Sequence, residues 1–172
     1  MGSSVETEVS YINYLLEHKR NIERVWNGIY PTLILAGLIN PEETEKIEEN
    51  IGKHDDSKFI QPEFSAYAAF FFGGRKNKRE ERRKRSYHKD SNKHYHRALK
   101  EYVSNDWKCY AVEMVCDWEA MGLVHGLSAN EYYVKAKEEI ELPLDYKSFV
   151  EEVLLVVAHL ELEEEKEMNI GL

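Results

Sequence analysis

The sequence lacks any apolar run that approaches the roughly 20 residues needed to cross a bilayer, which argues against a helical membrane protein. Its opening, MGSSVETEVS, has neither the basic nor the apolar region of a secretion signal. Only two cysteines occur, Cys109 and Cys116, and two turns of one helix would separate their Cα atoms by about 10 Å, too far for a disulfide. We therefore expect a cytoplasmic protein with reduced thiols and no membrane partner.

Positive charge is scarce outside one segment. The chain of 172 residues has a net charge of −9, whereas residues 75–85 (RKNKREERRKR) hold eight Lys or Arg against two Glu, which leaves the rest near −15. Such an acidic protein is a poor general nucleic-acid binder, since nonspecific affinity comes from neutralising many phosphates. We predict a basic loop over residues 73–85. It either stays solvated or binds a small phosphorylated ligand, with Arg75 and Arg82 as candidate contacts.

Helical signals recur from end to end of the sequence, and no segment is a convincing strand. A first helix is predicted from Ser3 or Ser4 to about Tyr30, and His18 falls on its apolar face. A second helix is predicted to start at Asn40-Pro41, and its inward face would continue through His54 and Asp55. Further helix starts are indicated at Gln61-Pro62, at Ser91, at Asn105 or Asp106 and at the capping box Ser128–Glu131. The apolar period over about 145–167 indicates a last helix. We predict an all-α fold with residues 1–172 in a single helical domain.

Histidine and aspartate recur on the inward faces of separate predicted helices, at His18, His54, Asp55, His88, His94 and Asp117. Imidazole and carboxylate together suit Mn, Fe, Ni, Co and Zn, and helices hold ligands more precisely than loops. Asp117 is the most informative of the set, because a carboxylate in an apolar stripe is costly unless it is paired or metal-bound. Each residue alone also fits an ordinary role, such as a hydrogen-bonded core histidine or a salt bridge from Asp117 to the basic loop.

The order of these residues, His … His-Asp … His … His … Asp, resembles the HD-domain superfamily of metal-dependent phosphohydrolases. The segment 54–58 (HDDSK) also resembles that superfamily's His-Asp-x-small-Lys motif. A closer similarity is to an uncharacterised family, frequent in bacteriophage genomes, with the motifs HDxSK(F/Y)…EF, NKHH and EMxCD. Here the motifs are HDDSKF with Glu63-Phe64, HKDSNKHYH over 88–96 and EMVCD over 113–117. The similarity covers about residues 54–121.

The resemblance implies an HD-like helical bundle with one or two divalent metal ions. His18, His54, Asp55 and Asp117 would hold one ion, and Asp55 would bridge to a second ion held by His88 and His94. The family's paired histidines are here His94 followed by Tyr95, with His96 displaced by one position. His94 is therefore the expected ligand, and His96 is the alternative.

Asp55, Lys58 and Glu113 are the candidate catalytic residues under this resemblance. Lys58 would place a positive charge beside the substrate phosphate. Glu113 lies one helical turn before Asp117, so it would orient a ligating histidine, shuttle a proton or form only a surface pair. Tyr67 belongs to an aromatic run that would stack on a base or simply pack in the core; the run comprises Phe59, Phe64, Tyr67 and Phe70 to Phe72.

We therefore expect a phosphodiesterase or phosphomonoesterase that acts on a nucleotide, a cyclic nucleotide or a similar small phosphorylated compound. One alternative is a protein that sequesters a nucleotide without cleaving it, for example a phage counter-defence factor in the host cytoplasm. Another is a structural or nucleic-acid interaction protein that uses residues 75–85 as its contact. The complete set of six candidate ligands favours the enzyme, since a sequestering protein has no need of them.

Overall fold

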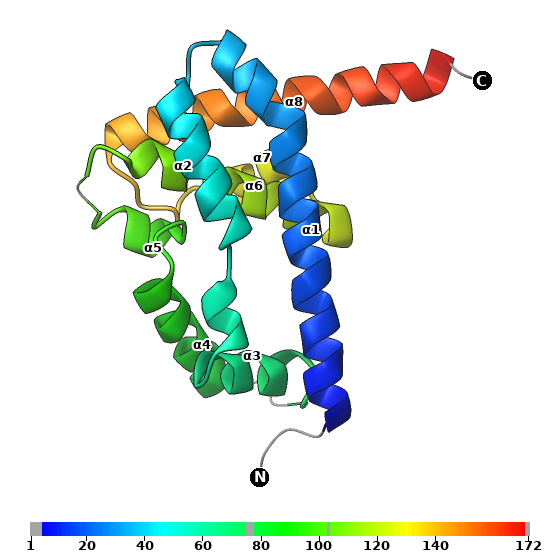
Figure 1. Ribbon diagram of the computed structural model, residues 1–172, viewed down its shortest axis with the longest axis vertical. Coiled ribbons are helices and arrows are strands. Elements are labelled where there is room, and N and C mark those ends of the chain that lie inside the picture. Colours follow the sequence, from blue (N-terminus) through cyan, green and yellow to red (C-terminus); the bar gives the residue numbers. More distant parts are fainter. Residues whose placement is uncertain (1–4, 75–77, 103, 171–172) are drawn as a thin grey trace.

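The computed structural model describes residues 5–74, 78–102 and 104–170. The elements in chain order are α1 (Val5–Leu35), α2 (Pro41–Gly52), the 3₁₀ helix η1 (Asp56–Phe59), α3 (Glu63–Phe71), α4 (Lys78–Ser91), α5 (His96–Leu99), α6 (Trp107–His125), α7 (Ala129–Ala136) and α8 (Leu144–Ile170) (Figure 1). No strand occurs in these described ranges, which confirms the predicted all-α class. None of the described helices has both the length and the apolarity that a membrane span requires.

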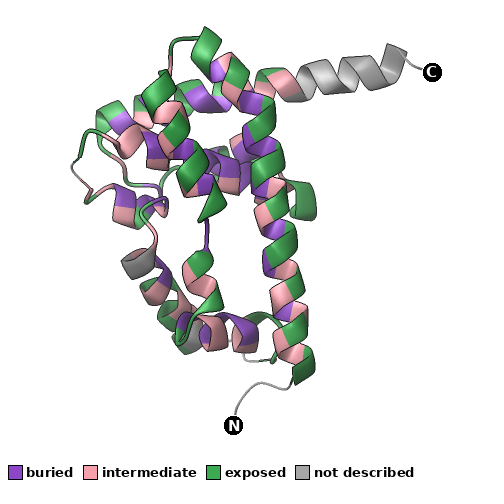
Figure 2. Cartoon of the chain, viewed as in Figure 1, coloured by how far each residue is buried: buried purple, intermediate pink, exposed green. Residues whose placement is uncertain are grey.

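Helix α6 lies at the centre of the bundle, where α1, α2 and α8 pack against it. Its buried side chains point in all directions around the helix axis, and Ala111, Val112, Val115, Cys116 and Ala120 are fully buried. Figure 2 shows this concentration of buried residues along α6. A helix that is buried on all sides is typical of the interior of a bundle. Carboxylates carried on α6 are therefore placed inside the protein.

The predicted helix starts at Asn40 and Ser128 are confirmed. The Asn40 side chain accepts from the Glu43 backbone, and the Glu43 carboxylate accepts from the Asn40 backbone, both at 2.9 Å. Ser128 forms the same reciprocal capping box with Glu131 at the start of α7. These caps satisfy backbone donors at the helix ends, so local sequence is enough to place them.

The predicted end of the first helix near Tyr30 is wrong, because α1 continues through Pro31 to Leu35. Pro31 has no N–H to donate to the Asn27 carbonyl one turn earlier. Both Pro31 and Asn27 lie on the exposed side of α1, so water can satisfy that carbonyl. The tertiary contacts of the opposite face then keep the helix intact.

The predicted basic loop over residues 73–85 is also wrong from Lys78 onward, since α4 begins there. Lys, Arg and Glu favour helices, and Glu81 and Arg85 form an ion pair at 2.7 Å across one turn. Ser91, predicted as a helix start, is instead the last residue of α4. Arg75 lies outside the described residues.

Candidate metal centre

Five segments of the chain bring the six candidate ligands together. His18 lies in α1, His54 and Asp55 in the turn between α2 and η1, His88 in the last turn of α4, His94 in the connection to α5, and Asp117 in α6. Five of these side chains are buried, while Asp117 keeps 23 % of its side chain exposed. We call these six residues the histidine–aspartate cluster. Residues that are far apart in the sequence thus share one interior site with an opening beside Asp117.

The prediction that His54 and Asp55 continue the face of α2 is wrong, because that helix ends at Gly52. Both residues lie in the turn that follows, and Asp55 has a left-handed backbone with φ of 58°. Non-glycine residues seldom adopt this conformation. In the turn, His54 and Asp55 are no longer held about 100° apart around a helix axis, so both side chains reach the cluster.

Lys19 holds this turn in place, although the sequence gives no signal for its role. Its Nζ donates to the backbone carbonyls of Gly52 and His54, both at 3.0 Å, and to Asp56 Oδ1 at 2.5 Å. One ammonium group thus ties α1 to both sides of Asp55. Because the side chain before it in α1 is His18, the same stretch of helix supplies one ligand and anchors two others.

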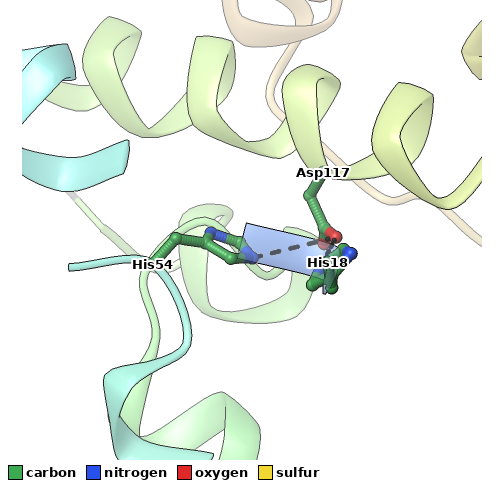
Figure 3. A group of neighbouring side chains, drawn as sticks. All are labelled: His18, His54 and Asp117. Carbon is green, nitrogen blue, oxygen red and sulfur yellow. Dashed lines mark ion pairs between the residues drawn. The ribbon is translucent and has the colours of Figure 1, made fainter. Parts of the chain in front are cut away.

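The first group within the cluster contains His18, His54, Asp55 and Asp117. His18 Nε2 lies 3.0 Å from Asp117 Oδ1 and 3.8 Å from Asp55 Oδ2. His54 Nε2 lies 3.4 Å from Asp55 Oδ2 and 3.8 Å from Asp117 Oδ1. Figure 3 shows His18, His54 and Asp117 pointing toward one another from three different segments. Donor atoms at 2.0–2.2 Å from one ion would lie about 2.8–3.6 Å apart, so this group needs little contraction to hold one.

The second group is built on the other oxygen of Asp55. Asp55 Oδ1 lies 3.8 Å from His94 Nε2 and 3.6 Å from His88 Nδ1. His54, Asp55 and His94 also offer donor atoms that all lie within 4.8 Å of one another. The two carboxylate oxygens of Asp55 therefore face different sets of histidines, which is the arrangement that a bridging ligand requires.

Besides His18 Nδ1, three buried atoms in the cluster make no hydrogen bond: His54 Nε2, His94 Nε2 and Asp55 Oδ1. A buried polar atom without a partner costs about 1–3 kcal/mol, so three such atoms at one point are costly. A divalent cation bound by imidazole nitrogens and carboxylate oxygens would satisfy all of them. The residues present therefore fit a metal ion.

Glu113 fixes the orientation of two of the histidines. Its Oε1 lies 2.9 Å from His54 Nδ1 and 2.8 Å from His94 Nδ1. Burial opposes the ionised carboxylate, but His94 and His54 outweigh it and lower the pKa of Glu113. Since the carboxylate accepts, each imidazole donates from Nδ1 and directs Nε2 into the cluster. Of the roles considered for Glu113, the geometry places it as a positioning residue for His54 and His94.

Glu63 also contacts a candidate ligand, His88, but through Nδ1, the same nitrogen that faces Asp55 Oδ1, and Glu63 was not predicted as a site residue. Its Oε1 lies 3.3 Å from His88 Nδ1, and the side chain is buried at the start of α3. Burial and then Lys58 lower the pKa of His88, which keeps this imidazole neutral and able to ligate. The one available signal was the Glu63-Phe64 motif itself.

In the metal-free protein, protons and an ammonium group balance the charge of Asp55. Lys58 Nζ donates to Asp55 Oδ2 at 2.5 Å. Burial opposes ionisation of Asp55, but Lys58 and His54 outweigh it and hold its pKa well below the usual value. Burial likewise opposes the charged form of His54, yet Asp55 and Glu113 raise the pKa of this imidazole to about 10. A proton on His54 thus takes the place that a metal ion would occupy beside Asp55.

Three other predicted site residues do not join the cluster. Arg82 is exposed on α4, where its Nε donates to the Lys78 carbonyl. Tyr67 is buried against Tyr11 of α1, with ring centroids 6.3 Å apart, and reaches the site only through Lys58, which lies 4.9 Å from its ring centroid. Tyr67 is therefore a core residue, whereas Phe59, Phe71 and Phe72 of the same aromatic run are exposed. His96 is buried nearby but belongs to neither group of donor atoms, and it is His94 that lies in the cluster.

A cavity of about 330 Å³ adjoins the cluster on the side of Asp117. Its lining comprises His88, His94, Tyr95, His96, Asp117, Trp118, Met121, Gly122, His125, Leu127 and Tyr132. Three of these residues belong to the cluster, and the others come from the start of α5, from α6, from α7 and from the loop between α6 and α7. We call this cavity the aromatic pocket. It was not predicted, because its walls meet only through the packing of α6 with α7.

A protein-family model matches most of the chain. Residues 7–157 match the family of unknown function DUF5662. The chain belongs to this family. The matched segment includes the whole histidine–aspartate cluster together with Lys19, Glu63 and Glu113, so the centre described here falls within the part shared with DUF5662. No curated protein and no solved structure matches the chain.

Proposed function

We propose that this protein is an HD-type metal-dependent phosphohydrolase that cleaves a phosphoester of a nucleotide, a cyclic nucleotide or a similar small phosphorylated compound. The observation that carries the proposal is the carboxylate of Asp55, whose two oxygens face separate sets of histidines. This arrangement provides for one or two divalent ions, namely Mn, Fe, Ni, Co or Zn. The adjoining cavity gives a substrate room beside them.

The chemistry would combine bound metal with the chain's own charges. A divalent ion held by His18, His54, Asp55 and Asp117 would lower the pKa of its bound water toward about 7 and neutralise charge on phosphoryl oxygens. Lys58 stays protonated, because Asp55 outweighs the effect of burial and raises the pKa of its ammonium group. With Asp55 ligating a metal ion, the Lys58 ammonium would be free to donate to a phosphoryl oxygen instead.

Other residues would keep this geometry fixed during the reaction. Glu113 holds His54 and His94 with their Nε2 atoms directed into the cluster, and Lys19 holds the turn that carries Asp55. Preorganised ligands need no rearrangement when charge develops on the substrate. Asp117, partly exposed at the edge of the pocket, marks the side from which a substrate would enter.

The free, buried cysteines Cys109 and Cys116 fit a reducing compartment, so the proposal includes a location in the cytoplasm, for a phage-encoded protein that of the host. Nucleic acid is not the proposed substrate, because basic side chains are concentrated in one helix, α4, of an otherwise acidic chain.

The proposal is tested with purified protein, Mn²⁺, Ni²⁺ or Co²⁺, bis-p-nitrophenyl phosphate and a panel of nucleotides. We expect metal-dependent hydrolysis that Asp55→Asn abolishes. The matched control is Asp145→Asn, which changes an exposed carboxylate at the start of α8 and should retain full activity. Hydrolysis that survives Asp55→Asn would refute the proposal. Tight binding with the ligand recovered intact would support the sequestering alternative.

A further inference from the structure

The aromatic pocket has a composition that selects among phosphorylated compounds. Apart from the three residues of the cluster, its lining is dominated by aromatic and apolar side chains, among them Tyr95, Trp118, Met121, Leu127 and Tyr132. None of the described residues that line it is Lys or Arg. The pocket therefore offers metal-ligating groups at one end and flat apolar walls beyond them. A ligand that fits carries its negative charge at one end only.

The aromatic side chains that line the pocket come from two parts of the chain. The rings of Trp118 and Tyr132 lie 5.3 Å apart between centroids, which joins α6 and α7 in one wall. Tyr95 lies 5.4 Å from the ring of His88 and 4.8 Å from the ring of His96, beside the cluster. Aromatic faces bind nucleobases by stacking, whatever the base.

Apart from His94 Nε2 of the cluster, one buried polar atom among the described lining residues has no hydrogen-bond partner. His96 is 9 % exposed, and its Nδ1 makes no hydrogen bond in the structure. A buried polar atom is normally hydrogen-bonded, so this nitrogen is available to the edge of a bound heterocycle. The pocket thus combines stacking surfaces with one buried group that can form a hydrogen bond.

Gly122 keeps the pocket floor close to the following loop. A Cβ at this position would lie 2.5 Å from the Leu127 carbonyl oxygen, which leaves no room for a side chain. The chain then turns at Gly126, whose φ is 69°, and returns into α7. This close approach brings Tyr132 toward Trp118 and shapes the apolar wall.

The size and surroundings of the pocket limit the ligand to a single phosphate. A volume of about 330 Å³ is at the lower end of the range of roughly 300–1,000 Å³ for small-molecule sites. The neighbouring groove beyond His96 does contain cations, but four glutamates also line it. Two of its cations are already paired, Lys89 with Glu101 at 2.9 Å and Lys100 with Glu141 at 2.6 Å. The third cation, Arg97, is exposed, but the four glutamates outnumber the three cations, so further phosphates would meet net negative charge there.

We propose that the aromatic pocket binds the base of a nucleotide with a single phosphate, which lies against the histidine–aspartate cluster while Trp118 and Tyr132 stack on the base. This inference rests on the proposed function and narrows its substrate class. It places specificity in residues of α6 and α7 rather than in the aromatic run of α3.

The test measures equilibrium binding by calorimetry with Mn²⁺-loaded protein. Three ligands are compared: a nucleoside phosphonate, in which a methylene group replaces the ester oxygen; methylphosphonate, which lacks the base; and the same nucleoside phosphonate extended by two phosphates. Stacking on aromatic side chains contributes roughly 5- to 150-fold in affinity per base. We expect the nucleoside phosphonate to bind at least about tenfold more tightly than methylphosphonate. The extended compound should bind no more tightly than the shorter one.

Substitutions in the pocket test whether its side chains cause the difference in affinity between ligands with and without the base. Trp118→Leu and Tyr132→Leu should each lower the affinity for the nucleoside phosphonate by about tenfold and leave the affinity for methylphosphonate unchanged. The control is Trp107→Leu, which removes a tryptophan stacked on Tyr146, among residues that do not line the pocket. Equal affinity of wild type and both pocket variants for the nucleoside phosphonate would overturn the inference. Tighter binding of the extended compound would also overturn it.

Failure of this inference is distinguishable from failure of the proposed function. Phosphoester hydrolysis is scored separately on base-bearing and base-free substrates. Base-dependent binding that needs Trp118, without any hydrolysis, would support the pocket and refute the enzyme. Hydrolysis that Trp118→Leu and Tyr132→Leu reduce equally for both kinds of substrate would refute the pocket and support the enzyme.

Discussion

Glu113→Gln is the substitution that tests the organisation of the centre most finely. The carboxylate accepts from His54 Nδ1 and His94 Nδ1 through one oxygen, at 2.9 and 2.8 Å. Glutamine has nearly the same shape, but its amide carries only one accepting oxygen, and its NH₂ group donates. If the NH₂ group faces either imidazole, that ring must accept at Nδ1. Its proton then moves to Nε2, where it blocks metal binding.

Loss of such an outer partner typically weakens metal binding by about 10- to 100-fold, which corresponds to about 1.4–2.8 kcal/mol. We expect Glu113→Gln to weaken Mn²⁺ binding by this amount, measured by calorimetry or by competition with a chelating dye. The fold should persist, since the substitution keeps volume and leaves the apolar faces of α6 unchanged.

Glu119→Gln is the matched control, because Glu119 is also a buried carboxylate on α6. Its Oε2 accepts from the Ala129 backbone at 2.8 Å, a bond that a glutamine oxygen can replace, and it has no contact with the cluster. Metal affinity should therefore stay within a factor of about two of the wild type. Equal affinities of Glu113→Gln and wild type would refute the positioning role.

Four further predictions follow from the same geometry. Lys19→Met should lower the free energy of unfolding by about 2 kcal/mol in urea titrations, because it releases the turn around Asp55. Lys58→Met should retain bound metal, by elemental analysis, yet reduce hydrolysis by about 100-fold. Affinity for Mn²⁺ should rise with pH, by up to about tenfold per unit between about pH 6 and 8, because binding displaces the proton from His54, whose pKa of about 10 leaves it charged there. Burial and then Glu43 raise the pKa of Cys109 to about 11, and burial raises that of Cys116, so neither thiol should react with a thiol reagent at about pH 8 until the protein unfolds.

Each of these predictions has a result that contradicts it. An unfolding midpoint of Lys19→Met at the same urea concentration as the wild type would contradict the anchoring role of Lys19. Loss of metal from Lys58→Met would make that lysine structural. Metal affinity independent of pH would mean that His54 is already neutral without metal. Rapid modification of native Cys109 or Cys116 would contradict their burial.

The parts of the fold that depend on local sequence could be predicted. The caps at Asn40 and Ser128 need only residues three positions apart, and the apolar period places His18 on the inner face of its helix. The order of histidines and aspartates along the sequence also identified candidate ligands that the fold brings together. These features are carried by side chains whose partners are near in sequence or whose type is rare in a core.

The features that escaped prediction depend on contacts between distant segments. Lys19 donates hydrogen bonds to the backbone carbonyls of Gly52 and His54. Every residue has a backbone carbonyl, so the sequence does not indicate which ones Lys19 contacts. Tyr67 of the aromatic run was open to two interpretations, and only its packing on Tyr11 of α1 identifies it as a core residue. The wall of the aromatic pocket needs Trp118 and Tyr132, which meet only when α6 and α7 pack. The charged run was predicted as a loop, but a helix, α4, forms there. Lys, Arg and Glu are common both in solvated loops and in helices, so charge alone does not distinguish the two.

The central claim is that six side chains from five segments bind divalent metal. Elemental analysis of the purified protein, before any metal is added and again after incubation with Mn²⁺ and removal of the excess, tests it directly. The account predicts one or two ions per chain in the wild type and in Asp145→Asn, and a clear loss of bound metal in Asp55→Asn. A wild-type protein that binds no metal under either condition would contradict the account.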